Sequence, residues 1–202
     1  MNITLPQYLY RGDCDKDNTR QIKATINYGL LMTNLSHGGN GQKIFREPLI
    51  ELVNKHVSTG WGKTHFLSFT TEKEIAFFYA AGESFYHRTH SDDNWNFAIF
   101  TLDTSRFIPD SIEQVDTGIY KAKYYPACRE FLPFYTIVLI DVSTCLKNVR
   151  NTANNTTEAI SNAERDKEWL IFPATAMRNS HEFTSKLDTG CIVEKEVYLF
   201  IN

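Results

Sequence analysis

Residues with reactive side chains occur near the ends of several expected strands. They are a guanidinium in the first strand, two hydroxyls in a middle strand and two carboxylates entering a late strand: Arg11, Ser68, Thr70, Asp166 and Glu168. A guanidinium binds anions through a planar fork, hydroxyls orient neighbouring groups, and carboxylates stabilise positive charge. These residues can act together only if the fold brings three distant segments to one cleft.

The two hydroxyls lie in a segment that predicts a strand leading directly into a helix. Alternation over residues 66–70 places Ser68 and Thr70 on one face of the strand. Thr71 and Glu74 form a capping-box pattern, which predicts a helix over residues 72–81. A strand end at a helix N-terminus exposes backbone amides and favours ligand binding. The alternative is that the hydroxyls form the solvated face of an edge strand.

The charged candidates have simpler interpretations as well. Arg11 closes a strand expected over residues 7–12, and it could instead pair with Asp13 or Asp15 on the surface. Glu168 begins a strand that follows a run of charged residues, and it could belong to that solvated run. Position in the chain therefore identifies these residues as candidates, and their roles depend on what surrounds them.

Composition limits the classes of protein to consider. A chain of 202 residues with 42% apolar content favours a single domain over residues 1–202. The net charge of −3 argues against binding nucleic acid by bulk electrostatics. No segment has the length of a membrane span, and no apolar leader follows the N-terminus, so the chain is expected to be cytoplasmic.

Cysteine and histidine spacing does not favour a metal site. The four cysteines are widely separated and are expected to be free thiols: Cys14, Cys128, Cys145 and Cys191. His37, His87 and His90 lack nearby carboxylate or thiolate partners, so we expect no metal.

The remaining elements follow from periodicity and turn residues. The pattern predicts a helix over 19–28, a loop over 33–42, a helical stripe from 44 to about His56, a strand over 95–102, a long excursion with one short helix over 104–133, a strand over 136–142, a mobile loop or a loop with a weak helix over 148–162, and a last strand over 191–201.

In order and spacing, these motifs make the chain similar to a known enzyme family. Residues 9–13 (LYRGD), 66–80 and 166–170 (DKEWL) resemble the mono-ADP-ribosyltransferases of the Arg-Ser-Glu class, which includes cholera and pertussis toxins. The resemblance implies an α+β fold with a split, mostly antiparallel β core and flanking helices. It also implies a toxin or effector that cleaves NAD as its substrate, needs no metal and transfers ADP-ribose to a protein. Delivery into a target cell without a cleaved signal is compatible with it.

The resemblance also implies a role for each matched residue. Glu168 would stabilise the positive charge that develops on the ribose when nicotinamide leaves, and Arg11 would bind the phosphates of NAD. Gly12 would let the backbone approach the nicotinamide amide. Ser68 would hydrogen-bond Glu168 or Arg11, and Thr70 would support the wall of the site.

Asp166 occupies the position that faces the acceptor in this family, where Glu or Gln is usual. An acid there accompanies transfer to arginine, so arginine is the acceptor we favour. Alternatives are an NAD glycohydrolase, an enzyme of the same scaffold that modifies nucleic acid, and a binding module without turnover. A second acid-x-Glu pattern at Glu194 and Glu196 ranks lower, because little chain follows it.

Overall fold

The computed structural model describes residues 3–14, 30–31, 49–59, 66–88, 95–125, 134–148, 156–173, 186–187 and 189–200. Within these ranges, eight strands form one antiparallel sheet in the order β10-β4-β1-β3-β8-β7-β6-β5. Their bounds are Tyr8–Cys14 (β1), Leu67–Thr70 (β3), Trp95–Asp103 (β4), Glu113–Asp116 (β5), Ile119–Tyr124 (β6), Tyr135–Asp141 (β7), Glu168–Pro173 (β8) and Ile192–Phe200 (β10). The short strands β2 (Leu30–Leu31) and β9 (Lys186–Leu187) pair with each other.

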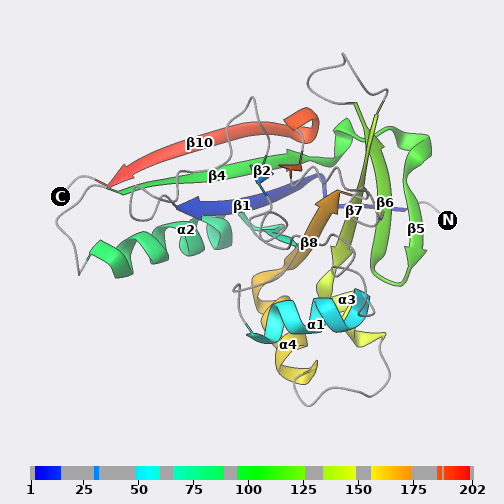
Figure 1. Cartoon of the computed structure of the whole chain (residues 1–202), viewed down its shortest axis with the longest axis horizontal. Helices are drawn as coiled ribbons and strands as arrows, with labels where there is room; N and C mark the ends of the chain where they lie inside the picture. The colour runs from blue at the N-terminus through cyan, green and yellow to red at the C-terminus, as the bar shows by residue number, and fades with distance from the viewer. Residues whose placement is uncertain are drawn as a thin grey trace, which may run out of the picture.

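In the described part of the chain, four α-helices flank this sheet. They are α1 (Leu49–Thr59), α2 (Lys73–Arg88), α3 (Val142–Lys147) and α4 (Thr156–Asp166). Helix α2 packs on β1 and β4, whereas α1, α3 and α4 pack together near β7 and β8 (Figure 1). The predicted α+β class with a mostly antiparallel sheet is confirmed.

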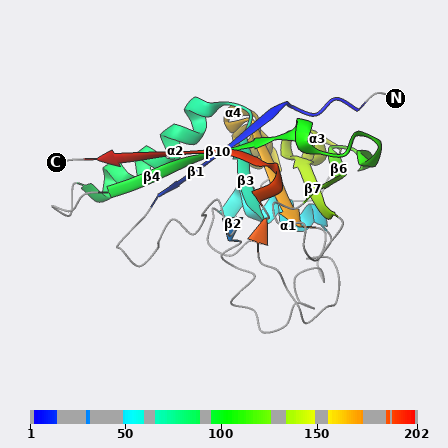
Figure 2. The same cartoon turned by 90° about the horizontal axis from the view of Figure 1, so that it is seen from above.

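The sheet changes direction between its two halves. In Figure 1, β10, β4 and β1 run across the direction of β7, β6 and β5, and Figure 2 shows the two groups extending to opposite sides. Among the described residues, β1 and β3 pair at one position, Tyr10 opposite Thr70. By contrast, β1 pairs with β4 along its whole length, and β3 pairs with β8 along its whole length. The strands that carry Arg11 and Ser68 are therefore joined at one point and separate beyond it.

Close packing of α2 against β1 depends on small residues. A Cβ atom at Gly12 would lie 2.1 Å from the carbonyl oxygen of Ala76 and 2.9 Å from the Cβ of Ala80. Ala76 and Ala80 are buried in a cluster with Phe97 and Ile99 of β4. Because a Cβ at position 12 would overlap helix backbone, glycine is required there for packing alone.

Most expected strands are present. Strands β1, β3, β4, β7, β8 and β10 match the predicted segments within two residues. Helix α2 continues to Arg88, past the predicted end at residue 81, and begins at Lys73. The hydroxyl that accepts an amide at its start is that of Thr70, from Glu72 N at 3.1 Å, rather than that of the predicted cap Thr71.

Two polar segments hold more regular structure than the sequence predicts. Within residues 104–133, β5 and β6 form a hairpin that extends the main sheet, accompanied by two 3-10 turns, and residues 126–133 lie outside the description. Residues 156–166 form helix α4, whereas residues 148–162 are predicted as a mobile loop or a loop with a weak helix. The predicted helix over 19–28 and loop over 33–42 also lie outside the described residues.

Candidate functional site

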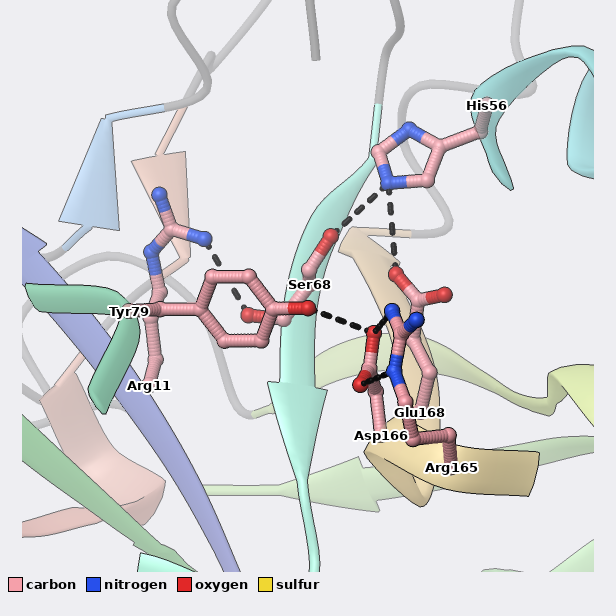
Figure 3. A network of polar contacts seen from close by, with 7 residues as sticks. All are labelled: Arg11, His56, Ser68, Tyr79, Arg165, Asp166 and Glu168. Carbon is pink, nitrogen blue, oxygen red and sulfur yellow. Dashed lines mark hydrogen bonds and ion pairs between the residues drawn. The ribbon is translucent and has the colours of Figure 1, made fainter. Parts of the chain in front are cut away.

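Arg11 lies where β1 separates from β3. Its Nη1 donates a hydrogen bond of 3.1 Å to the backbone carbonyl of Ser68 (Figure 3). Its Nε is buried and has no hydrogen-bond partner in the part of the chain that the structure describes. A buried N–H without a partner is costly, so an anion that accepts from this guanidinium would remove that cost. The simpler pairing of Arg11 with Asp13 or Asp15 concerns side chains outside the description.

Ser68 and Glu168 meet at a histidine. His56 Nε2 lies 2.7 Å from Ser68 Oγ and 3.6 Å from Glu168 Oε1 (Figure 3). Glu168 stands directly opposite Thr70 in the β3–β8 pairing, so the glutamate, Ser68 and Thr70 share one face of the sheet. The resemblance implies a direct hydrogen bond between the Ser68 hydroxyl and Glu168 or Arg11. The hydroxyl instead contacts His56, and the Ser68 carbonyl binds Arg11.

His56 is the site residue that sequence reasoning missed. It lies near the end of α1, its side chain is 5% exposed, and its ring packs edge-on against Phe66 at 5.6 Å between centroids. One ring nitrogen contacts both the hydroxyl and the carboxylate. Because both contacts are made by Nε2, the ring holds the Ser68 hydroxyl and the Glu168 carboxylate beside each other. The only signal in the sequence was a histidine at the end of an apolar helical stripe.

Asp166 forms a second polar cluster at the end of α4. Tyr79 OH donates to its Oδ2 at 2.6 Å, and Arg165 donates from Nε to Oδ1 at 2.7 Å and from Nη2 to Oδ2 at 2.9 Å. Burial acts to raise the pKa of Asp166, but the hydrogen bonds from Arg165 and Tyr79 outweigh it and hold that pKa below its ordinary value. Burial and the bond to Asp166 raise the pKa of Tyr79 to about 12.

The turn between α4 and β8 sets the direction of Glu168. Lys167 has a φ of 49°, in the left-handed region that non-glycine residues rarely adopt. Its carbonyl accepts a 3.4 Å hydrogen bond from Thr71 N, next to the end of β3. This contact ties the turn to β3, so Glu168 begins its strand beside the hydroxyl-bearing strand.

The other sequence candidates have clear structural environments. Thr70 is buried, and its hydroxyl accepts the amide of Glu72 at 3.1 Å. Gly12 is explained by the approach of α2, without any ligand. In the competing pattern, Glu196 pairs with Lys73 and accepts from Tyr198 OH at 2.8 Å, on β10. These contacts account for Glu196 as part of the packing between α2 and β10.

Three other features would favour a different kind of site in the described residues: a metal-binding cluster, a membrane-spanning helix or a cavity. No group of three or more His, Cys, Asp or Glu could hold a metal ion within the described ranges. None of the helices in those ranges is both long enough and apolar enough to span a membrane. A cavity of about 350 Å³ lies between α1 and strands β5 to β7, and the candidate residues above are not among its described lining residues.

Comparisons with known proteins add no family assignment. No protein-family model matches the chain, and no curated protein matches its sequence. Function must therefore be argued from the geometry around Arg11, Ser68 and Glu168.

Proposed function

We propose that this protein cleaves the nicotinamide glycosidic bond of NAD and transfers ADP-ribose to a protein side chain. The observation that carries the proposal is the meeting of three segments at the bend of the sheet. Arg11 binds the carbonyl of Ser68, and the Ser68 hydroxyl contacts a histidine that also faces Glu168. A guanidinium, a hydroxyl and a carboxylate are the residue types that the resemblance to the Arg-Ser-Glu transferases implies, and the division of the sheet between β1 and β3 is compatible with their fold.

The central group in the proposed chemistry is a half-buried carboxylate, Glu168. Nicotinamide leaves with the electrons of its glycosidic bond, and positive charge develops on the ribose. The Glu168 side chain is 15% exposed, so its charge is screened less than a surface carboxylate would be. A full charge about 4 Å away at an effective dielectric constant of about 20 is worth about 4 kcal/mol, or roughly 10³ in rate.

Arg11 supplies the recognition of the dinucleotide. Its planar guanidinium suits the phosphates of NAD, and its Nε, which has no hydrogen-bond partner among the described residues, is a donor that a phosphate oxygen would satisfy. Ser68 acts through its contacts rather than on the substrate, since its carbonyl fixes Arg11 and its hydroxyl contacts His56. Thr70 closes the wall behind Glu168. The group that accepts ADP-ribose is a side chain of a target protein. That target lies in the cytoplasm of the producing cell or of a cell into which this protein is delivered.

A second function, NAD hydrolysis with water as acceptor, is favoured by one observation. Both oxygens of Asp166 are bonded by Arg165 and Tyr79 of the same chain. If Asp166 serves only these internal contacts, the enzyme would lack a group to hold an acceptor.

Labelled NAD incubated with the protein and a cell extract separates these possibilities. The transferase transfers label to a protein band, and Glu168→Gln, which keeps the shape but removes the charge, lowers that transfer by orders of magnitude. Asp166→Ala should lose transfer and keep some hydrolysis. Nicotinamide release without labelled protein would favour the hydrolase, and equal labelling by wild type and Glu168→Gln would contradict the proposal.

A further inference from the structure

Asp166 already holds a guanidinium, and that guanidinium belongs to the same chain. Arg165 makes two parallel hydrogen bonds to it, from Nε to Oδ1 and from Nη2 to Oδ2 (Figure 3). This is the fork geometry by which a carboxylate binds an arginine side chain. Tyr79 OH occupies a third acceptor position, on Oδ2. A second guanidinium therefore cannot form the same two bonds while Arg165 stays in place.

We propose that Arg165 is a displaceable internal occupant of the acceptor position, and that an arginine of the target protein must replace it at Asp166. The inference rests on the proposed function, because it takes Asp166 as the acid that faces the acceptor. It deepens that function by naming Arg165 as the residue that restrains the access of an acceptor arginine to the site.

The two neighbours of Asp166 differ in how firmly they are held. The Arg165 side chain is 65% exposed at the end of α4, whereas that of Asp166 is 21% exposed. Tyr79 comes from α2, and its bond to Asp166 links that helix to the end of α4. Tyr79 thus fixes the carboxylate from one side, while Arg165, which also interacts with the Tyr79 hydroxyl, is mostly surrounded by solvent.

The expected size of the effect follows from this exposure. Exposed ion pairs contribute little, because solvent screens them and because fixing two side chains costs entropy. Competition from Arg165 should weaken the binding of an added guanidine by about two- to fivefold. The restraint is thus small enough for a protein substrate with further contacts to overcome, and it disfavours free arginine and other small guanidines.

Agmatine, a small guanidine, tests this inference in two independent ways. Its KM is measured in NAD-dependent transfer, and its Kd is measured without NAD by NMR titration. In Arg165→Gln both constants should fall about two- to fivefold. Arg165→Lys keeps the charge but loses the fork geometry, so its KM and Kd for agmatine should lie between those of wild type and those of Arg165→Gln. Lys147→Gln is the matched control, since it removes an exposed cation that pairs with Glu164 of the same helix as Arg165, and both constants should match wild type.

Combining Arg165→Gln with Asp166→Asn tests whether Arg165 acts through Asp166. In that background Arg165→Gln should no longer change the Kd for agmatine, because the acid for which the two guanidiniums compete is gone. An unchanged or weaker Kd in Arg165→Gln, a fall that persists in the Asp166→Asn background, or no agmatine binding to either protein would overturn the inference. If Arg165→Gln tightens agmatine binding but wild type releases no nicotinamide from NAD, the proposed function fails and the role of Arg165 stands.

Discussion

His56 offers the sharpest test of how the site is held together. The ring lies between α1 and β3, and its Nε2 contacts Ser68 Oγ at 2.7 Å and Glu168 Oε1 at 3.6 Å. His56→Ala would remove both contacts and leave a cavity beside Phe66. His56→Gln is the matched variant, because a glutamine amide can reach a similar position to Nε2 and still donate to either oxygen.

The expected loss in stability can be worked from these contacts. The hydrogen bond to Ser68 is worth about 1 kcal/mol, and the cavity left by a buried ring adds about 2 kcal/mol. The contact with Glu168 is longer than a hydrogen bond and adds little. His56→Ala should therefore lower the free energy of unfolding by about 3 kcal/mol, which corresponds to roughly 6 to 12 °C in Tm for a chain of this size. His56→Gln should lose about 1 kcal/mol or less.

Urea denaturation measures the stability, and nicotinamide release from NAD measures the effect on the site. A carboxylate displaced by about 1 Å can cost about 10²-fold in rate, so His56→Ala should lose activity under conditions where it remains folded, and His56→Gln should keep most of it. If the free energies of unfolding of both variants lie within about 0.5 kcal/mol of the wild-type value, the contact geometry is refuted. Loss of stability with full activity in His56→Ala would refute its positioning role.

Three further predictions follow from packing and from shifted pKa values. Gly12→Ala should cost about 2 to 4 kcal/mol in urea denaturation, because its Cβ would overlap the carbonyl of Ala76, and an unchanged midpoint would contradict this packing. The lowered pKa of Asp166 contributes stability above its ordinary pKa that is lost as pH falls through the folded value. Wild type should therefore lose stability more steeply than Asp166→Asn below about pH 4, and parallel pH profiles would argue against the cluster. Burial raises the pKa of Cys145 to about 11, so at pH 8 iodoacetamide should label it at least about 100 times more slowly in the folded protein than in urea, and equal rates would show that the thiol is exposed.

Local patterns predicted the strands that carry the site. Alternation at Ser68 and Thr70, the turn after Arg11 and the apolar run after Glu168 each depend on neighbouring residues, and the corresponding strands β1, β3 and β8 are present. Helix α4 was underestimated because its sequence is polar. Its buried residues Ala159 and Ala163, four positions apart, were the helical signal.

Long-range contacts were beyond sequence reasoning. The contact between His56 and Ser68 depends on how α1 packs beside β3, and the bond from Tyr79 to Asp166 joins residues 87 positions apart. The hairpin of β5 and β6 was missed because residues 113–116 are all exposed and give no apolar alternation. Its turn was nonetheless marked by Gly118, which has a φ of 72°.

The most direct measurement is the release of nicotinamide from NAD by the purified protein, with Glu168→Gln beside it and NAD binding measured for both. We predict release by wild type, a rate lower by roughly 10³ or more in the variant, and similar Kd values for NAD. No release by wild type, or equal release by both proteins, would contradict the assignment of Glu168 to the reacting ribose.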